Sequence, residues 1–444
     1  MRERLLPAIA VAALLAAASA GLTSARAEDA ARAQRLRALA DAYCEDGDLA
    51  RARSALEAIA ATPSDLLAIL REPARPDMEG GTRTLEIKDE FGKKTELLII
   101  APPTEVLKKR TRPLGLIVLL HGLGGAARNA TPFAEKLCAQ GDVICVAPTA
   151  TKLPLKAMDW DDGIPEIARA NFKHWWSYDD PRSLTLVAID KARELFWIDP
   201  ERVALGGVSM GGYGTWNIGL RFPDRFCALA PIAGGISRFG AISDKDAYSR
   251  ALLENGRNVS VFSAHGTKDP LVPCEPDREA CEYLKKLGGT VEFLGLDVGH
   301  TPADLKRALE GPELDRVLRF MAAQRRCAAP ASVKYVALSE KQDGAHWLRI
   351  KERSSDETRP VLEGRVDETH TRLIVETRGC RRARVYLDER ILDGEREVEV
   401  VANGRRVFKG KIEASLEAVL ESWRSRRDPG LVYAAFVDAG PRFR

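Results

Sequence analysis

The stretch Gly207-Val208-Ser209-Met210-Gly211 decides how this chain folds. The run 202–206 before it is mostly aliphatic and predicts a short buried strand, and the segment 212–220 after it continues as a helix. Ser209 therefore lies at the apex of a tight strand-to-helix turn, where its backbone is strained and its hydroxyl points out of the sheet. The two glycines let strand and helix approach closely, and the Met210 N–H lies at the positive end of the helix.

Two later strand-like runs are each followed by a side chain that can help to activate a serine. Asp269 follows the run 259–266, and His300 follows the run 290–296. The chain order serine, aspartate, histidine is typical of hydrolases built on a mostly parallel sheet. Upstream, an aliphatic run ends in His121-Gly122-Leu123-Gly124-Gly125, a glycine-rich loop that can present a backbone N–H to a developing oxyanion.

These segments resemble the α/β-hydrolase fold family. More narrowly, they are similar to secreted esterases of the polyhydroxybutyrate-depolymerase and feruloyl-esterase type, and to prolyl-oligopeptidase-type catalytic domains. The resemblance covers about residues 83–326 and rests on the turn at Ser209, on the segment 265–273 and on Gly299-His300-Thr301-Pro302. It implies an α/β fold in which helices cover both faces of a mostly parallel sheet.

Ser209 is the expected nucleophile, and it needs a base within hydrogen-bond reach. His300 alone has the expected position in the chain order, so we predict that it acts as general base and then as general acid. Of the other five histidines, His121 and His265 precede glycine at strand ends, where histidines more often brace loops. His174 precedes the serine in the chain. His346 and His370 fall in the C-terminal part.

Asp269 is the acid expected to hold the tautomer of His300 and to stabilise its imidazolium. Asp277 and Asp297 are alternatives, although Asp297 is only three residues from His300.

The oxyanion hole is predicted to use the backbone N–H groups of Met210 and Leu123. Met210 follows from the turn itself. Gly124 is an alternative to Leu123 because the loop can shift the donor by one residue.

Composition and charge exclude several classes of partner. The chain has 444 residues, with 67 Lys and Arg against 64 Asp and Glu, a net charge of +3. This balance gives no electrostatic case for binding nucleic acid or an anionic membrane. The sequence has no C-x-x-C motif and no histidine pair at metal-ligand spacing, so we expect neither a metal nor another cofactor.

The chain is expected to be exported, to the periplasm or the extracellular space. Residues 1–27 have the features of a signal peptide, with Arg2 and Arg4, a following apolar stretch and the small-x-small pattern Ala25-Arg26-Ala27. No later stretch is long and apolar enough for stable membrane insertion after cleavage.

Three parts are expected after the signal. Residues 28–72 have helical periodicity, residues 83–326 alternate strands with helices, and residues 332–444 are β-rich, with a hairpin at Asn403-Gly404. The last part is predicted to be a small separate domain. It resembles the C-terminal appendage of some secreted bacterial hydrolases.

Eight cysteines in an oxidising compartment permit disulfides. Cys274 with Cys281 is the first candidate pair and Cys138 with Cys145 the second, while free buried cysteines are the alternative.

Two further segments have open interpretations. The aromatic stretch 160–178 either lines a substrate subsite or packs on the sheet, and residues 236–255 form either a lid or a surface helix.

Together these features predict an exported serine hydrolase that cleaves carboxylic esters through an acyl-enzyme intermediate. The expected partner is a small-molecule or polymer ester, such as an acetyl or feruloyl ester of plant polysaccharide or a short hydroxyalkanoate ester. A serine peptidase of the prolyl-oligopeptidase type is one alternative. A non-catalytic binding protein on the same fold is another, although such a protein has no need of all three side chains in order.

Overall fold

The computed structural model describes residues 28–139, 141–152, 176–236, 247–301, 303–304, 311–355 and 359–440. The expected signal peptide and most of the aromatic stretch 160–178 therefore lie outside the described residues. The chain divides into two compact units. The first combines the N-terminal residues up to Glu72 with Glu413–Ala435, and the second combines Pro73–Ile412 with the residues from Phe436 onward.

The first unit is helical. Its described elements are a helix over 28–46, α2 (Leu49–Ala58), α3 (Pro63–Arg71), α13 (Leu416–Arg426) and the short 3-10 helix η5 (Pro429–Leu431). Thr62 and Asp65 form a reciprocal capping box at the start of α3, which satisfies backbone N–H groups that a helix leaves unpaired. Tyr43 donates a hydrogen bond to Glu421 at 2.7 Å, so α13 packs with the N-terminal helices and not with the β-rich part to which the sequence analysis assigned it.

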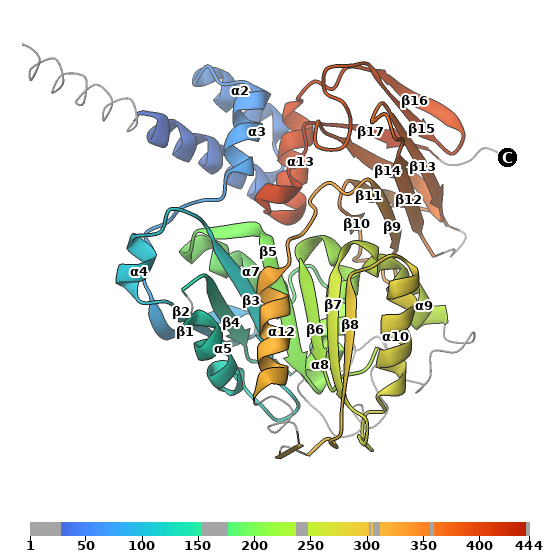
Figure 1. Ribbon diagram of the computed structural model, residues 1–444. Helices are drawn as coiled ribbons and strands as arrows, with labels where there is room; N and C mark the ends of the chain where they lie inside the picture. Colours follow the sequence, from blue (N-terminus) through green and yellow to red (C-terminus); the bar gives the residue numbers. More distant parts are fainter. Residues whose placement is uncertain are drawn as a thin grey trace, which may run out of the picture. The chain divides into compact units, whose positions relative to one another are not determined.

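The second unit is built on an eight-stranded sheet in the order β1-β2-β4-β3-β5-β6-β7-β8 (Figure 1). β1, β2 and β4 are joined by antiparallel pairing, and the pairs from β4 through β3 to β8 are parallel. The strands are β1 (Gly81–Lys88), β2 (Lys94–Ala101), β3 (Leu114–Leu120), β4 (Val143–Pro148), β5 (Ile198–Val208), β6 (Ala228–Ile232), β7 (Ser260–Gly266) and β8 (Val291–Leu296).

Helices cover both faces of this sheet (Figure 1). Neighbouring strand residues alternate between two apolar clusters, as the period of two requires: Leu116 and Val118 belong to one and Ile117 to the other. The first cluster includes α7 (Leu184–Leu195), α8 (Met210–Arg221), α9 (Ala247–Glu254) and α10 (Glu275–Lys286), and the second α5 (Thr131–Cys138) and α12 (Pro312–Ala323). Shorter helices are α4 (Thr104–Lys108), η1 (Ala127–Ala130), η3 (Pro223–Arg225) and η4 (Asn255–Asn258).

The C-terminal strands form two smaller sheets, in the orders β10-β11-β14-β17 and β16-β15-β13-β12-β9. Asn403 and Gly404 both have positive φ and join β15 to β16, which confirms the expected hairpin. The strands are β9 (Ser332–Val336), β10 (Gly344–Ala345), β11 (Leu348–Arg353), β12 (Val361–Val366), β13 (Arg372–Arg378), β14 (Cys380–Leu387), β15 (Val398–Ala402), β16 (Arg405–Gly410) and β17 (Ala435–Ala439).

These strands are bound to the large sheet's helices by buried hydrogen bonds. The Tyr335 hydroxyl donates to the Arg221 carbonyl at 2.9 Å, and Val336 N–H donates to the Asn255 side chain at 2.7 Å. The residues 332–412 therefore belong to the same compact unit as the large sheet.

All eight cysteines lie within the described residues and are free thiols, including the two candidate pairs. The structure therefore agrees with the alternative prediction, that the cysteines are free, and neither candidate disulfide is formed. Among the described helices, none combines the length and the apolar character needed to cross a bilayer.

Candidate active site

Ser209 occupies the turn between β5 and α8 in a conformation that non-glycine residues rarely adopt, with φ +55° and ψ −116°. Such a backbone costs on the order of 1–3 kcal/mol and persists only where its surroundings hold it. Here the Ser209 N–H donates to the Ile232 carbonyl at 2.8 Å, and the Ser209 carbonyl accepts from Tyr213 N–H at 3.0 Å. The strained turn that the sequence predicts at this serine is confirmed.

The flanking glycines are required by close backbone contacts. A Cβ on Gly207 would lie 2.6 Å from the carbonyl carbon of Gly211 and 2.9 Å from the Cβ of Leu120. A Cβ on Gly211 would lie 2.7 Å from the carbonyl carbon of Leu120. Because real Cβ atoms essentially never come this close to other heavy atoms, larger residues would push α8 away from β3 and β5.

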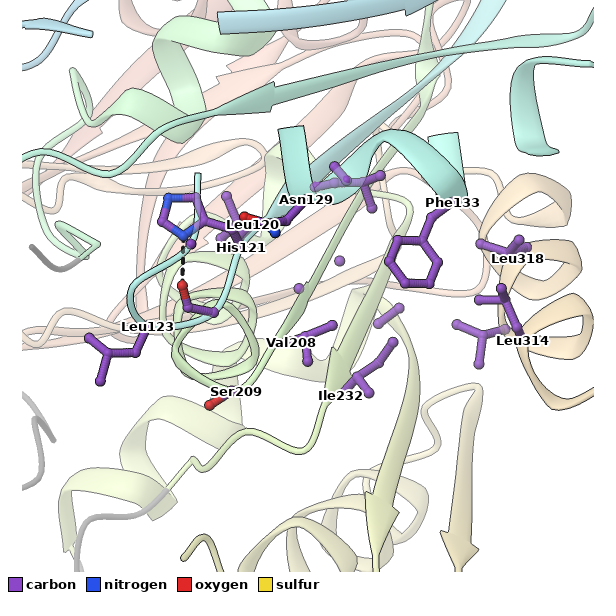
Figure 2. Close-up of a pocket in the computed structure, with 18 of the residues that line it drawn as sticks. Leu120, His121, Leu123, Asn129, Phe133, Val208, Ser209, Ile232, Leu314 and Leu318 are labelled. Atoms are coloured by element: carbon purple, nitrogen blue, oxygen red, sulfur yellow. Dashed lines mark hydrogen bonds between the residues drawn. The ribbon is translucent and has the colours of Figure 1, made fainter. Parts of the chain in front are cut away.

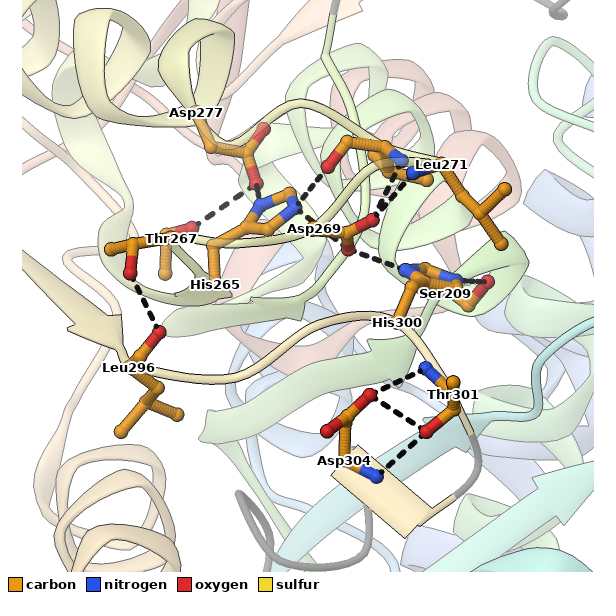
Figure 3. A network of polar contacts seen from close by, with 12 residues as sticks. Ser209, His265, Thr267, Asp269, Leu271, Asp277, Leu296, His300, Thr301 and Asp304 are labelled. Carbon is orange, nitrogen blue, oxygen red and sulfur yellow. Dashed lines mark hydrogen bonds and ion pairs between the residues drawn. The ribbon is translucent and has the colours of Figure 1, made fainter.

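A continuous series of hydrogen bonds runs from Ser209 through His300 to Asp269 (Figure 3). Ser209 Oγ lies 2.8 Å from His300 Nε2, and His300 Nδ1 lies 2.5 Å from Asp269 Oδ2. The other oxygen, Asp269 Oδ1, accepts from the N–H groups of Leu271 at 2.9 Å and Val272 at 2.8 Å. The structure thus brings together the three side chains proposed from chain order, with the acid fully buried.

The two alternative acids have other partners. Asp277 lies in the first turn of α10 and contacts His265, with Oδ2 3.0 Å from the ring Nδ1. Asp297 is largely exposed and forms an ion pair with Lys268 at 2.8 Å. Asp269 is therefore the acid that the structure places on His300.

His121 and His265 brace loops, as their positions before glycine suggested. His121 Nε2 accepts the Ala150 N–H at 3.0 Å, so the ring proton is on Nδ1, which donates to the Gly122 carbonyl at 2.7 Å. His265 Nε2 lies 2.9 Å from the Val272 carbonyl. Each histidine thus fixes a loop beside Ser209 or Asp269.

The glycine-rich loop passes directly beside the serine. A Cβ on Gly122 would lie 3.5 Å from the Cβ of Ser209, so the Gly122–Leu123 peptide borders the nucleophile position. Gly125 N–H closes a turn on the Gly122 carbonyl at 3.1 Å, and Gly124 has φ +70°. The Leu123 N–H takes no part in the hydrogen bond that closes this turn. Met210 is the first residue of α8, where a helix offers N–H groups without intrahelical acceptors.

An apolar cavity of about 510 Å³ opens beside Ser209 and His300 (Figure 2). Its far wall is formed by Phe133 of α5 and by Leu314 and Leu318 of α12, whose side chains point into the space in Figure 2. Gly206 and Gly207 of β5 also line the cavity, and their lack of side chains enlarges it. The sequence analysis did not identify this cavity because its walls come from segments that are distant from one another in the chain.

The described end of the aromatic stretch packs in the protein interior. Trp176 is 1% exposed, and its indole N–H donates to the His121 carbonyl at 3.3 Å. Tyr178 is 2% exposed. These two rings therefore pack in the protein interior and do not line a substrate subsite. The remainder of the stretch and residues 237–246 of the expected lid lie outside the described residues.

Residues 182–305 match the family described as Phospholipase/Carboxylesterase. With the sheet order and the turn at Ser209, this match decides the fold. The second unit contains an α/β-hydrolase domain. The α/β-hydrolase segment includes Ser209, Asp269 and His300, and the fold class expected from the sequence is confirmed.

Two curated relatives are named acyl-protein thioesterase 1. The one from Gibberella zeae is 31% identical over 128 residues, which are 29% of this chain and 50% of the relative. The one from Emericella nidulans is 26% identical over 204 residues, 41% of this chain and 79% of the relative. The α/β-hydrolase chain thus spans about half the length of the first relative.

Solved structures to which the chain is similar include a thermostable esterase at 22% identity and a TM-score of 0.40, covering 55% of this chain and 63% of that one. Another is FphF, a fluorophosphonate-binding serine hydrolase of Staphylococcus aureus, at 19% identity and a TM-score of 0.41, covering 55% of this chain and 100% of that one.

Proposed function

We propose that this protein is a serine hydrolase that cleaves carboxylic esters through an acyl-enzyme intermediate. The observation that supports it is the hydrogen-bonded series of three side chains. Ser209 Oγ lies 2.8 Å from His300 Nε2, and His300 Nδ1 lies 2.5 Å from Asp269 Oδ2. A binding protein would have no need of a strained serine aligned with a histidine and a buried acid.

In the proposed reaction, Ser209 Oγ attacks the ester carbonyl carbon while its proton moves to His300 Nε2. The tetrahedral oxyanion is stabilised by the N–H groups of Met210 and Leu123, each contributing about 3 kcal/mol. His300 then gives the proton to the leaving alcohol oxygen, which leaves the acyl group on Ser209. A water molecule, activated by the same histidine, releases the acid and restores the serine.

The cavity supports an ester with an apolar acyl group. Its lining is mostly aliphatic, and its volume exceeds what an acetyl group fills. An unsubstituted acyl chain fits this mostly aliphatic lining better than the hydroxyacyl chain expected from the sequence, because burying a hydroxyl among aliphatic side chains is costly. A thioester of the same acyl group belongs in the test panel because the curated relatives carry the name acyl-protein thioesterase.

Export remains part of the proposal. Its support is the sequence of residues 1–27, with Arg2 and Arg4 before an apolar stretch and Ala25-Arg26-Ala27 at its end. N-terminal sequencing of the protein recovered from a cell envelope or medium fraction tests it, with Glu28 as the expected first residue.

The activity is tested with p-nitrophenyl esters from acetate to dodecanoate, a matched acyl thioester and a peptide p-nitroanilide. We expect ester turnover that Ser209→Ala lowers by at least about 10³-fold without loss of folding. Ser54→Ala, at an exposed position of α2, is the matched control and should retain full activity. Turnover of the anilide alone would indicate the peptidase alternative, and no Ser209-dependent turnover would refute the proposed function.

A further inference from the structure

His265 and Asp277 form a buried pair directly behind Asp269 (Figure 3). Both side chains are fully buried, at the end of β7 and in the first turn of α10. His265 Nδ1 lies 3.0 Å from Asp277 Oδ2, and Nε2 lies 2.9 Å from the Val272 carbonyl and 3.5 Å from Asp269 Oδ2. The proposed reaction makes no direct use of this pair.

The surroundings of the ring determine where its protons are. A carbonyl only accepts hydrogen bonds, so Nε2 must carry a hydrogen toward Val272. Nδ1 faces a carboxylate, and a lone pair there would be repelled by ionised Asp277. One proton is therefore held on the line between Nδ1 and Oδ2. Ser263 Oγ also donates to Asp277 Oδ2, at 3.3 Å, which favours the carboxylate and leaves the proton on the ring.

The electrostatics agree with this assignment. Burial of the ring opposes its charged form, but the hydrogen bond and the charge of Asp277 outweigh that effect and raise the pKa of His265. The nearby Asp269 carboxylate acts in the same direction. Burial raises the pKa of Asp277, and the hydrogen bonds from His265 and Ser263 oppose that rise. Because both ring nitrogens face acceptors, we infer that the shared proton is on the ring and that His265 is an imidazolium.

Val272 connects this pair to the acid of the active site. Its carbonyl accepts from His265 at 2.9 Å, and its own N–H donates to Asp269 Oδ1 at 2.8 Å. With Oδ1 bound by backbone N–H groups, Oδ2 of Asp269 is directed at His300. The histidine thus determines the position of the turn that carries Asp269.

We propose that His265 is a positioning residue for ester cleavage, and that with Asp277 it fixes the turn 266–272 and keeps Asp269 ionised toward His300. This inference rests on the proposed function. The proton of His265 stays in place during turnover, while the Ser209 proton moves through His300. The imidazolium of His265 supplies the positive charge that a buried carboxylate at Asp269 needs.

The other titratable groups around the pair leave this proton where it is. Tyr213 of α8 and Cys281 of α10 face it, and His300 lies beyond Asp269. Burial and the charge of Asp277 raise the pKa values of both Tyr213 and Cys281, so both side chains remain neutral over the pH range of the assays. Asp269 and Asp277 are the two carboxylates that compete for the His265 ring.

Two substitutions separate the position of the turn from the charge of the ring. In Asp277→Asn, the His265 Nδ1–H can donate to the new amide oxygen, which leaves the Nε2 lone pair against the Val272 carbonyl and releases the turn. In His265→Gln, a side-chain N–H can still reach Val272, but the positive charge is lost. His370→Gln, at an exposed position of the turn between β12 and β13, is the matched control.

We expect Asp277→Asn to lower kcat for a p-nitrophenyl ester by about 10–100-fold with little change in KM, because a displaced acid misdirects His300. His265→Gln should retain more of kcat. Its acid limb of kcat/KM should move to higher pH by about 0.5 unit or more, because less positive charge opposes protonation of His300. His370→Gln should match the unsubstituted protein. Folded variants with unchanged kcat and unchanged pH profiles would overturn the proposal.

A second measurement needs neither turnover nor folded variants. Nuclear magnetic resonance of protein labelled with ¹⁵N-histidine reports the protonation of each ring. The His265 signals should show an imidazolium at pH 7, because the pKa of His265 is raised above its ordinary value. A His265 ring that is neutral at pH 7, or that titrates near the ordinary value of about 6.5, would refute the inference. Failure of the proposed function would instead appear as Ser209-independent turnover, whatever the state of His265.

Discussion

Gly211→Ala tests whether the approach of α8 to β3 sets the position of the nucleophile. The added Cβ would lie 2.7 Å from the Leu120 carbonyl carbon and 2.9 Å from the His121 carbonyl oxygen. The Leu120 carbonyl oxygen would be closer still. Ordinary van der Waals contact needs more than about 3 Å, so the start of α8 must retreat by about 1 Å. The atoms it meets are backbone, which cannot rotate away as a flexible side chain would.

The expected effect is larger on catalysis than on stability. Overpacking of this kind costs about 1–3 kcal/mol, and the better helix propensity of alanine offsets up to about 1 kcal/mol of that cost. A displacement near 1 Å in an aligned site lowers the rate by about 10²-fold. We therefore expect kcat for p-nitrophenyl butyrate to fall by about 30–100-fold, while the free energy of unfolding falls by about 1–2 kcal/mol.

The two quantities are measured by steady-state kinetics and by urea unfolding of the same preparation. Gly410→Ala, at a β16 position where the nearest atom to the new Cβ is 3.5 Å away, is the control and should change neither. A folded Gly211→Ala protein with a kcat within threefold of the unsubstituted protein would refute the reasoning. It would show that the position of Ser209 does not depend on the contact between α8 and β3.

Two other substitutions test the cavity and the acid stability. Leu318→Trp should fill the cavity and remove the preference for octanoate over butyrate, which we expect at about 10²-fold from about 0.8 kcal/mol for each of four methylenes. Arg319→Trp, at an exposed position of α12, should keep that preference, and retention of it by Leu318→Trp would disprove the acyl site. Glu254 accepts hydrogen bonds from Tyr283, Arg257 and Lys334, and although burial opposes its charge, these partners lower its pKa to about 2. Because the folded value is depressed, its stabilisation is present above about pH 4.5 and is lost as the pH falls toward 2. Glu254→Gln should therefore reduce the free energy of unfolding by about 2 kcal/mol at pH 7 and less at pH 3, and an equal loss at both would contradict this assignment.

The sequence predicts the region around Ser209 well because local requirements act on neighbouring residues there. Gly207 and Gly211 are needed within the same turn, and the backbone contacts that exclude a Cβ at both positions are the physical reason. The Asn403-Gly404 hairpin is predictable for a similar reason, since its two positive φ angles suit this residue pair. Such features depend on a few consecutive residues and therefore appear in the sequence.

Features that depend on tertiary packing are less accessible. The helix Leu416–Arg426 has the caps and periodicity of any surface helix, and nothing in its sequence indicates that it packs with residues 28–72. Its grouping rests on contacts such as the hydrogen bond from Tyr43 to Glu421, which spans most of the chain. The cavity beside Ser209 is similar, because it exists only where α5, α12 and the strands β3, β5 and β6 meet.

The choice between Asp269 and Asp277 shows how small the deciding differences are. Both follow β7, both are fully buried, and both contact a histidine ring. What separates them is the turn after Gly266, which directs the N–H groups of Leu271 and Val272 at one oxygen of Asp269 and leaves the other for His300. Asp277 lies in the first turn of a helix instead, and its carboxylate is held by His265. A sequence motif identifies the segment that carries the acid, whereas the backbone hydrogen bonds of that segment decide which carboxylate reaches the base.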